Sequence, residues 1–168
     1  MIFRLAEKND LPLLKTMYKE IIDNMNRNNI QIWDEVYPCE FFQNDIDYQR
    51  LYLLVDDDIA AAFALSESND GEGHLIWNNP KAKALYIDRF GVNVNYSRLG
   101  LGEQMLKNAI SLAKQKNAEY LRLLVVDINK PAINLYLKNG FQQVDGIYEE
   151  RIDDFVLREY GFEIEIKK

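Results

Sequence analysis

A glycine-containing loop that leads into a helical pattern is the segment of this chain best suited to hold a ligand. Arg98, Gly100 and Gly102 follow the apolar run 85–92, and residues from Leu101 onward keep helical spacing. Glycine lets the backbone approach a ligand closely, and the first turn of a helix presents unpaired N–H groups and a positive dipole. The loop is therefore suited to a phosphate or pyrophosphate, with Arg98 as a charge-assisted donor. A tight turn without any ligand has the same composition.

Two common nucleotide-binding motifs do not describe this loop. The dinucleotide fingerprint G-x-G-x-x-G needs a third glycine where this chain has Met105, and it belongs to the first strand–helix unit of its fold. A Walker loop needs Gly-Lys followed by Ser or Thr, and that sequence is missing here. A generic nucleotide-binding domain therefore rests on the glycine loop alone.

Tyrosine and carboxylate side chains on nearby elements are candidates for moving protons. Tyr136 lies on a short helical pattern, and its hydroxyl is suited to protonating a leaving thiolate, although a tyrosine on a helix is more often a core residue. Tyr86 and Asp88 project from one face of the strand that enters the loop. Asp88 can take a proton directly or through a water, or it can pair with an arginine or face solvent.

An aromatic segment follows the first helical pattern. Trp33, Glu35 and Tyr37 crowd this segment, as they would in the wall of a small pocket or as a cover for a sheet edge. His74 has no Cys or His near it in the sequence, and Cys39 has no recognisable base partner. We therefore expect no metal site.

Hydrophobic periodicity predicts the elements that position these residues. Asp10 and Asn129 are expected to cap helices, and Gly140 to end the last one. The order of the elements predicts one α/β domain over residues 1–168, with helices on the faces of a sheet. The expected strands cover 2–6, 51–55, 59–65, 85–92, 121–126, 141–151 and 155–166, and the expected helices cover 10–25, 39–49, 101–116 and 130–139.

The composition argues against several functional classes. The chain has 168 residues with 20 Lys and Arg against 27 Asp and Glu, a net charge of −7, so it has no basic surplus for binding nucleic acid. No apolar run approaches the roughly 18 residues that a membrane span needs. A lone cysteine, Cys39, cannot form an internal disulfide. Charged residues also come too early in the sequence for the apolar region of a secretory signal peptide. We therefore expect a cytoplasmic protein.

Two segments together resemble the motifs of the GNAT N-acetyltransferase superfamily. Residues 92–106, VNVNYSRLGLGEQML, are similar to its acetyl-CoA-binding motif V-x-P-x-Y-[Q/R]-x-x-G-x-[G/A], with Ser97 and Val94 as departures. Residues 129–141, NKPAINLYLKNGF, are similar to its second motif, N-x-x-A-x-x-x-Y-x-x-x-G-F. Residues 30–38 are similar to Q-x-W-x-x-x-Y-P, an acceptor-side loop of bacterial small-molecule members. The resemblance implies a central mixed sheet of about seven strands with splayed middle strands and about four helices.

The resemblance also implies roles for particular residues. Acetyl-CoA would be the co-substrate, its pyrophosphate held by backbone N–H groups from Ser97 to Gly102 and its pantetheine arm paired with Val92. Tyr136 would protonate the departing thiolate. The reaction also needs a group that takes the proton of the acceptor amine, and Asp88 or a water held by the face of Tyr86 and Asp88 is our candidate for it. The implied cofactor-binding residues are Val92, Ser97, Arg98, Leu99, Gly100, Leu101, Gly102 and Asn129. The implied acceptor-binding residues are Trp33 and Tyr37, and we add Tyr86 because it shares a strand face with Asp88.

The predicted function is acetyl-CoA-dependent N-acetylation of a primary amine of a small molecule, by direct attack and without a metal. Two alternatives stay open: transfer to a protein N-terminus or lysine, and a non-catalytic acetyl-CoA sensor or regulatory module. The expected partner is the amine acceptor, with neither nucleic acid nor membrane. The C-terminal strands are a common dimer edge in such folds, which leaves a homodimer open.

Overall fold

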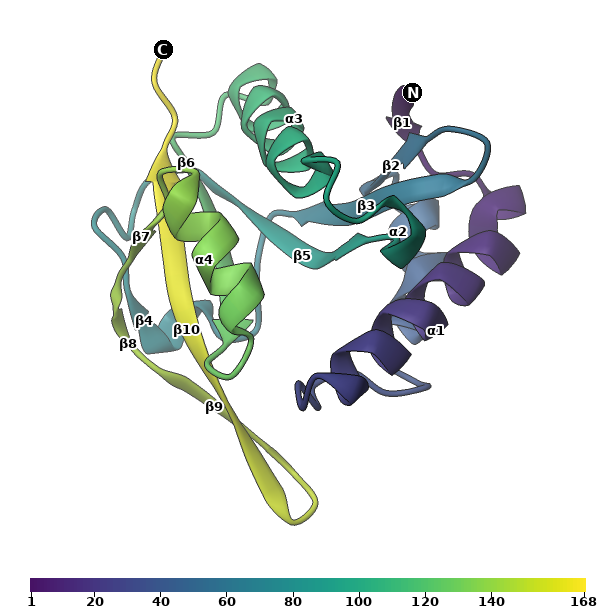
Figure 1. Ribbon diagram of the computed structural model, residues 1–168. Coiled ribbons are helices and arrows are strands. Elements are labelled where there is room, and N and C mark those ends of the chain that lie inside the picture. Colours follow the sequence, from purple (N-terminus) through teal and green to yellow (C-terminus); the bar gives the residue numbers. More distant parts are fainter. The chain divides into compact units, whose positions relative to one another are not determined.

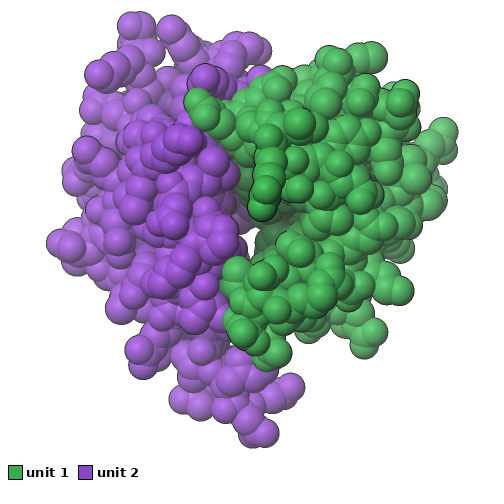
Figure 2. Space-filling view, viewed as in Figure 1, with its two compact units in different colours: residues 1–65, 89–105 green, residues 66–88, 106–168 purple.

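Four α-helices and a mixed sheet make up the fold in the computed structural model, which describes residues 1–168 (Figure 1). The strands of the main sheet follow the order β1-β2-β3-β5-β6-β10-β7, and β9 pairs with β10. The chain divides into two units, residues 1–65 with 89–105 and residues 66–88 with 106–168 (Figure 2). Strand β5 (Ala84–Val92) and helix α3 (Leu101–Gln115) each contribute residues to both units.

The first unit is built on an antiparallel ladder and two helices. Strand β1 (Ile2–Leu5) pairs with β2 (Leu51–Val55), and β2 pairs with β3 (Ile59–Ser66). Helix α1 (Leu11–Arg27) and the short α2 (Phe42–Asp47) bury apolar side chains in one cluster with these strands. Burial of such an apolar stripe is the main source of helix stability in proteins. The cluster includes Leu14, Met17, Tyr18, Ile21, Phe42, Leu51 and Leu53.

The second unit is built on parallel and antiparallel pairs around β6 (Tyr120–Val126). Strand β5 runs parallel to β6 from the pair Ala84↔Tyr120 to the pair Ile87↔Leu123. On its other side β6 pairs antiparallel with β10 (Phe155–Glu165), which also forms a hairpin with β9 (Tyr148–Ile152). Helix α4 (Lys130–Lys138) connects β6 to the short β7 (Gln142–Gln143).

The expected closing strand 141–151 is wrong in detail, because it is broken into β7, β8 (Asp145–Gly146) and β9. Gly146 has a φ of +99°, and a Cβ there would lie 2.6 Å from the His74 carbonyl oxygen. This close approach lets β8 leave the main sheet and pair with β4 (Leu75–Ile76), a strand that lies between the expected strands 59–65 and 85–92 and was not among those expected.

The expected side-chain cap of α1 by Asp10 is also wrong. Asp10 precedes the helix, but its carboxylate makes no cap bond to it. The carboxylate accepts hydrogen bonds from the Arg4 guanidinium at 2.8 and 2.9 Å and from the Glu7 N–H at 2.7 Å. The Arg4 guanidinium lowers the pKa of this carboxyl from its ordinary value. The other expected strands and helices are confirmed, with small changes in where they begin and end.

No helix of this chain combines the length and the apolar character that crossing a membrane requires.

Candidate functional site

The glycine loop and the start of α3 lie in the first unit and form a run of backbone donors. The first hydrogen bond of the helix runs from the Gln104 N–H to the Gly100 carbonyl at 3.1 Å, so the amides just before Gln104 have no acceptor inside the helix. Arg98 and Gly100 have left-handed backbones, with φ of +65° and +74°. A Cβ at Gly100 would meet nothing within 4 Å, so the backbone conformation rather than space requires glycine there.

The side chains of this loop are available to a ligand. Ser97, Arg98 and Leu99 are exposed, and the Arg98 guanidinium makes no hydrogen bond or ion pair. The Ser97 N–H already donates to the Val94 carbonyl at 3.4 Å, so a bound pyrophosphate would gain its donors from Arg98 and from the amides just before Gln104. The loop fits the phosphate ligand that the sequence predicted for it.

Asn93 anchors the entry to the loop, a role that sequence reasoning missed. It is 2% exposed, and its side-chain amide donates to the Ile59 carbonyl at 2.8 Å while its backbone N–H donates to the Ala60 carbonyl at 2.8 Å. Its side-chain oxygen accepts from the Asn95 N–H at 2.9 Å. These bonds tie the end of β5 to the start of β3. An asparagine just after a strand is typical of such a turn, and this was the signal in the sequence.

Strand β5 is distorted at Arg89, where φ is +54° inside the strand. The Arg89 guanidinium donates to both carboxylate oxygens of the fully buried Asp45 at 2.7 Å each, and Arg50 donates to the same carboxylate at 2.8 Å. The Tyr18 hydroxyl donates to the Arg89 carbonyl at 2.5 Å. A Cβ on Gly91 would lie 2.9 Å from the Tyr18 ring. Helices α1 and α2 therefore fix the distorted part of β5 through side chain and main chain.

The aromatic segment expected to bind the acceptor is folded onto the first unit. The Trp33 ring lies 5.8 Å from that of Tyr18, and the Tyr37 ring lies 5.3 Å from that of Phe41 in an edge-on arrangement. Asp34 accepts the N–H groups of Val36 and Tyr37 at 2.8 and 2.9 Å, which fixes the turn between the two aromatic residues. Both expected acceptor residues are partly buried.

In the second unit, the third residue expected to bind the acceptor, Tyr86, lies in a core cluster. It is 2% exposed, and its hydroxyl donates to the Glu72 carboxylate at 2.7 Å. Burial and the hydrogen bond with Glu72 raise the pKa of Tyr86 to about 12. Two residues on, Asp88 accepts a hydrogen bond from the Asn69 side chain at 3.1 Å. Its role as the proton acceptor stays a prediction, as does the role of Tyr86.

Glu159 is a candidate that sequence reasoning missed. It lies on β10, opposite Val126 of β6 and opposite Tyr148 of β9. Burial first, and then the charges of Glu150 and Asp88, raise the pKa of Glu159 to about 7. We call Asp88, Glu150 and Glu159 the acidic cluster. Nothing in the local sequence marks Glu159, because only the strand register brings it near the other two.

Tyr136 lies on α4, on the other face of the same sheet. Its ring is 6.3 Å from that of Phe162, which pairs with Leu123 and so belongs to the face opposite Glu159. Tyr136 is 5% exposed, and burial raises the pKa of its phenol. Its proton is therefore held more firmly than in water. Asn129 is confirmed as the cap of α4, since its side chain accepts the Ala132 N–H at 3.4 Å.

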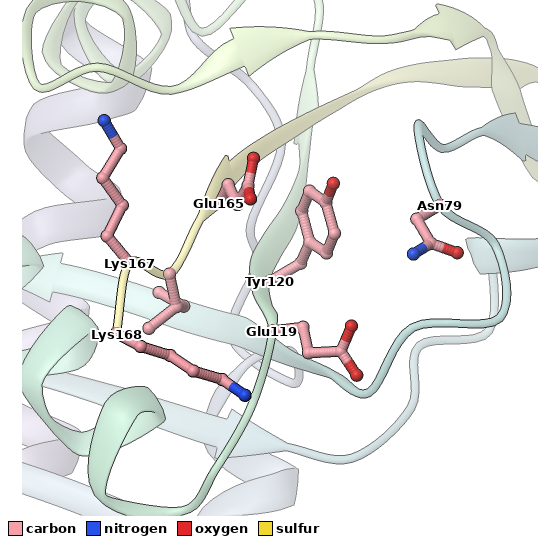
Figure 3. Close-up of a pocket in the computed structure, with 7 residues that line it drawn as sticks. Asn79, Glu119, Tyr120, Glu165, Lys167 and Lys168 are labelled. Carbon is pink, nitrogen blue, oxygen red and sulfur yellow. The ribbon is translucent and has the colours of Figure 1, made fainter.

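A depression of ≈ 500 Å³ lies at the opposite end of β6 from Val126 (Figure 3). It contains none of the expected site residues, and glutamate and lysine side chains both border it. Its lining residues are Asn79, Glu119, Tyr120, Glu165, Ile166, Lys167 and Lys168.

With this geometry in place, the chain was compared with known proteins. Residues 16–141 match the model of the acetyltransferase (GNAT) family. The chain belongs to the GNAT acetyltransferase family. An N-alpha-acetyltransferase of Sulfurisphaera tokodaii is 29% identical over 126 residues, which cover 73% of this chain and 75% of that protein.

Solved structures share the fold over nearly the whole chain. A GNAT-family acetyltransferase of Listeria monocytogenes 4b F2365 has a TM-score of 0.74 at 18% identity, covering 98% of this chain and 94% of that one. The yncA protein of Salmonella typhimurium, solved with its cofactor acetyl-CoA, has a TM-score of 0.68 at 12% identity, covering 100% and 95%. At these identities the likeness concerns the fold.

Family membership confirms three predictions: the α/β fold, the acetyltransferase activity and acetyl-CoA as the co-substrate. The chain is thus a GNAT acetyltransferase enzyme, and a sensor without catalysis is no longer needed to explain the motifs. The narrower expectation of a bacterial small-molecule type is not confirmed, because the archaeal relative is an N-alpha-acetyltransferase.

Proposed function

We propose that this GNAT acetyltransferase acetylates the primary amine of a small molecule, by direct attack of the neutral amine on the thioester carbonyl. The observation that carries the choice of an amine is the acidic cluster, Asp88, Glu150 and Glu159, on one face of the sheet in the second unit. Three carboxylates gathered on one face attract an ammonium group. The folded aromatic segment around Trp33 and Tyr37 favours a compact acceptor over an extended peptide, because its rings are packed rather than open.

Residues around the glycine loop would hold the co-substrate. In this proposal the backbone N–H groups of the loop bind the pyrophosphate, and Arg98 adds a charged donor. The exposure of the loop and its left-handed residues support this assignment. Val92 would pair through its backbone with the pantetheine arm, and Asn129 would help to shape the slot for it. The proposed set is Val92, Ser97, Arg98, Leu99, Gly100, Leu101, Gly102 and Asn129.

Tyr136 would supply the proton that the departing thiolate takes. A buried phenol with a raised pKa stays protonated at neutral pH, so it is a donor and not a base. Tyr136→Phe should therefore lower kcat while leaving acetyl-CoA binding nearly intact. An unchanged kcat in this variant would remove Tyr136 from the mechanism.

The acceptor class can be tested with three probes at saturating acetyl-CoA: putrescine, free lysine, and a short peptide with a free α-amine and no lysine. Release of free CoA and the mass of the product give kcat/KM for each. We expect the two small amines to be acetylated with the higher kcat/KM. A higher kcat/KM for the peptide would contradict the proposal.

The second candidate acceptor is a protein N-terminus. The observation that favours it is the 29% identity with the N-alpha-acetyltransferase of Sulfurisphaera tokodaii. The same assay separates the two, because a peptide blocked at its α-amine should then lose all acetylation. Acetylation of the blocked peptide at an added lysine would instead identify a lysine acceptor.

A further inference from the structure

We propose that Glu159 accepts the proton that the acceptor ammonium must lose before its nitrogen can attack. This inference rests on the proposed function, since it assumes an amine acceptor. It assigns the base to a residue on β10, whereas the sequence pointed to Asp88 on β5 or to a water near it.

Strand register places Glu159 and Asp88 on the same face of the sheet. Glu159 pairs with Val126, the last residue of β6. Asp88 follows Ile87, which pairs with Leu123 of the same strand. Successive residues of a strand alternate between faces, so Asp88 shares a face with Val126 and with Glu159. On β9, Glu150 is two residues from Tyr148, the partner of Glu159, and therefore also shares this face.

The charges facing Glu159 are anions from two other strands: β9, which pairs with β10, and β5, which β6 separates from β10. Asp88 comes from β5 and Glu150 from β9, and each lies close enough to disfavour its ionised form. From the segment before β4, the His74 ring lies 5.0 Å from the Tyr148 ring. Burial first, then the charges of Glu150 and Glu159 and last that of Asp70, raise the pKa of Tyr148. The carboxylate of Glu159 makes no hydrogen bond or ion pair, so no cation compensates its charge.

The nearest arginine in the sequence does not change this balance. Arg158 precedes Glu159 on β10 and therefore projects to the other face. Its guanidinium lies 3.9 Å from the Glu149 carboxylate, with both side chains exposed. An ammonium group entering on the face of Glu159 would thus meet a carboxylate that has no ion pair of its own.

Asp88 and Glu159 would divide the work on the acceptor. The Asn69 amide donates to Asp88 at 3.1 Å, and a donor of this kind favours the ionised carboxylate. Asp88 would therefore hold the ammonium as a fixed anion. Glu159 has a pKa raised to about 7, which makes it a stronger base than an ordinary carboxylate of about 4.3.

The proton balance of the step follows from these roles. Glu159 takes one proton from the ammonium. The nitrogen then forms a bond to the acetyl carbon while the C–S bond breaks, and Tyr136 donates a proton to the sulfur. Because Tyr136 lies on the opposite face, the thioester would have to lie beyond the pair Ile87↔Leu123, where the pairing of β5 with β6 ends. On becoming an amide the nitrogen loses a second proton to solvent. Solvent returns a proton to Tyr136, which restores its phenol. Glu159 returns its own proton to solvent, so one proton is released in each turnover.

The test is the pH dependence of kcat/KM from pH 5 to 9, with the best of the three probe amines and saturating acetyl-CoA. In the native enzyme kcat/KM should rise with pH and level off above about 7, because the base must be ionised. Glu159→Gln should lower kcat/KM by about 10²–10⁴-fold and remove this rise. Retained stabilisation by acetyl-CoA in thermal unfolding would show that the variant is folded.

Two neighbouring glutamates give matched variants. Glu150→Gln removes a like charge beside Glu159, so the rise should move to lower pH. Glu149→Gln changes the adjacent residue on the other face and should leave the profile where it is. A rise that stays in place in Glu150→Gln and persists in folded Glu159→Gln would overturn the role of Glu159. If the native enzyme acetylates none of the probes while binding acetyl-CoA, the proposed acceptor class itself falls.

Discussion

Two carboxylates, one in each unit of this chain, show how surroundings rather than depth decide what a buried acid does. Asp45 in the first unit is fully buried, and Arg50 and Arg89 donate to its oxygens at 2.7–2.8 Å. Glu159 in the second unit is less deeply buried but has Asp88 and Glu150 as its charged neighbours. The first carboxylate therefore fixes the backbone of β5, and the second is poised to gain and lose a proton.

Removing the carboxylate of Asp45 should have the largest effect on stability. Asp45→Ala takes away the anion that Arg89 and Arg50 share, and breaking a buried ion pair from one side costs about 3–5 kcal/mol. Urea unfolding of the variant should show this loss. Asp47→Ala, an exposed position on the same helix, is the control and should change the free energy of unfolding by less than about 0.5 kcal/mol. Equal effects of the two variants would contradict a special role for Asp45.

Removing the carboxylate of Glu159 should instead increase the free energy of unfolding. Its pKa is about 7 in the folded chain and about 4.3 when unfolded, so between these values the folded state binds more protons and stability falls as pH rises. Glu159→Gln escapes this cost and should be more stable than the native chain by about 1–3 kcal/mol at pH 8, with the difference vanishing below about pH 4. Urea unfolding at both pH values measures it. A variant less stable at pH 8 would contradict the account.

A smaller loss is expected where Tyr18 holds the main chain of β5. Tyr18→Phe removes the hydroxyl that donates to the Arg89 carbonyl and keeps the ring that packs against Gly91. The expected cost is about 1 kcal/mol in urea unfolding, the size of one hydrogen bond. Tyr48→Phe, at a side chain that is 72% exposed, serves as the control and should be neutral. A neutral Tyr18→Phe would mean that Asp45 alone holds this part of the strand.

Local patterns in the sequence predicted most of the elements and the glycine loop. Helical spacing gave α1, α3 and α4, and the apolar runs gave β2, β3 and β6. The errors came where a distant contact overrode local preference. Arg4 takes the Asp10 carboxylate away from its expected cap, and the approach of Gly146 to His74 breaks the expected closing strand.

Only part of the candidate site could be predicted from the sequence, and the reason is physical. The loop around Gly100 could be predicted because the residues suited to binding a phosphate are close together in the sequence. Asp45 is 44 residues from Arg89, and Glu159 is brought beside Asp88 only by the order and register of three strands. Such pairs leave no periodic signal in one sequence. The charged neighbours of Asp45 and Glu159 could therefore be identified only in the structure.

The most direct test of the central claim is the protonation of Glu159 itself. Protein labelled with ¹³C at the glutamate carboxyl carbons can be titrated by NMR from pH 3 to 9, with Glu159→Gln used to assign the resonance. The account predicts a midpoint near 7 that moves to lower pH in Glu150→Gln. A midpoint below about 5 in the native chain, unchanged in Glu150→Gln, would contradict it.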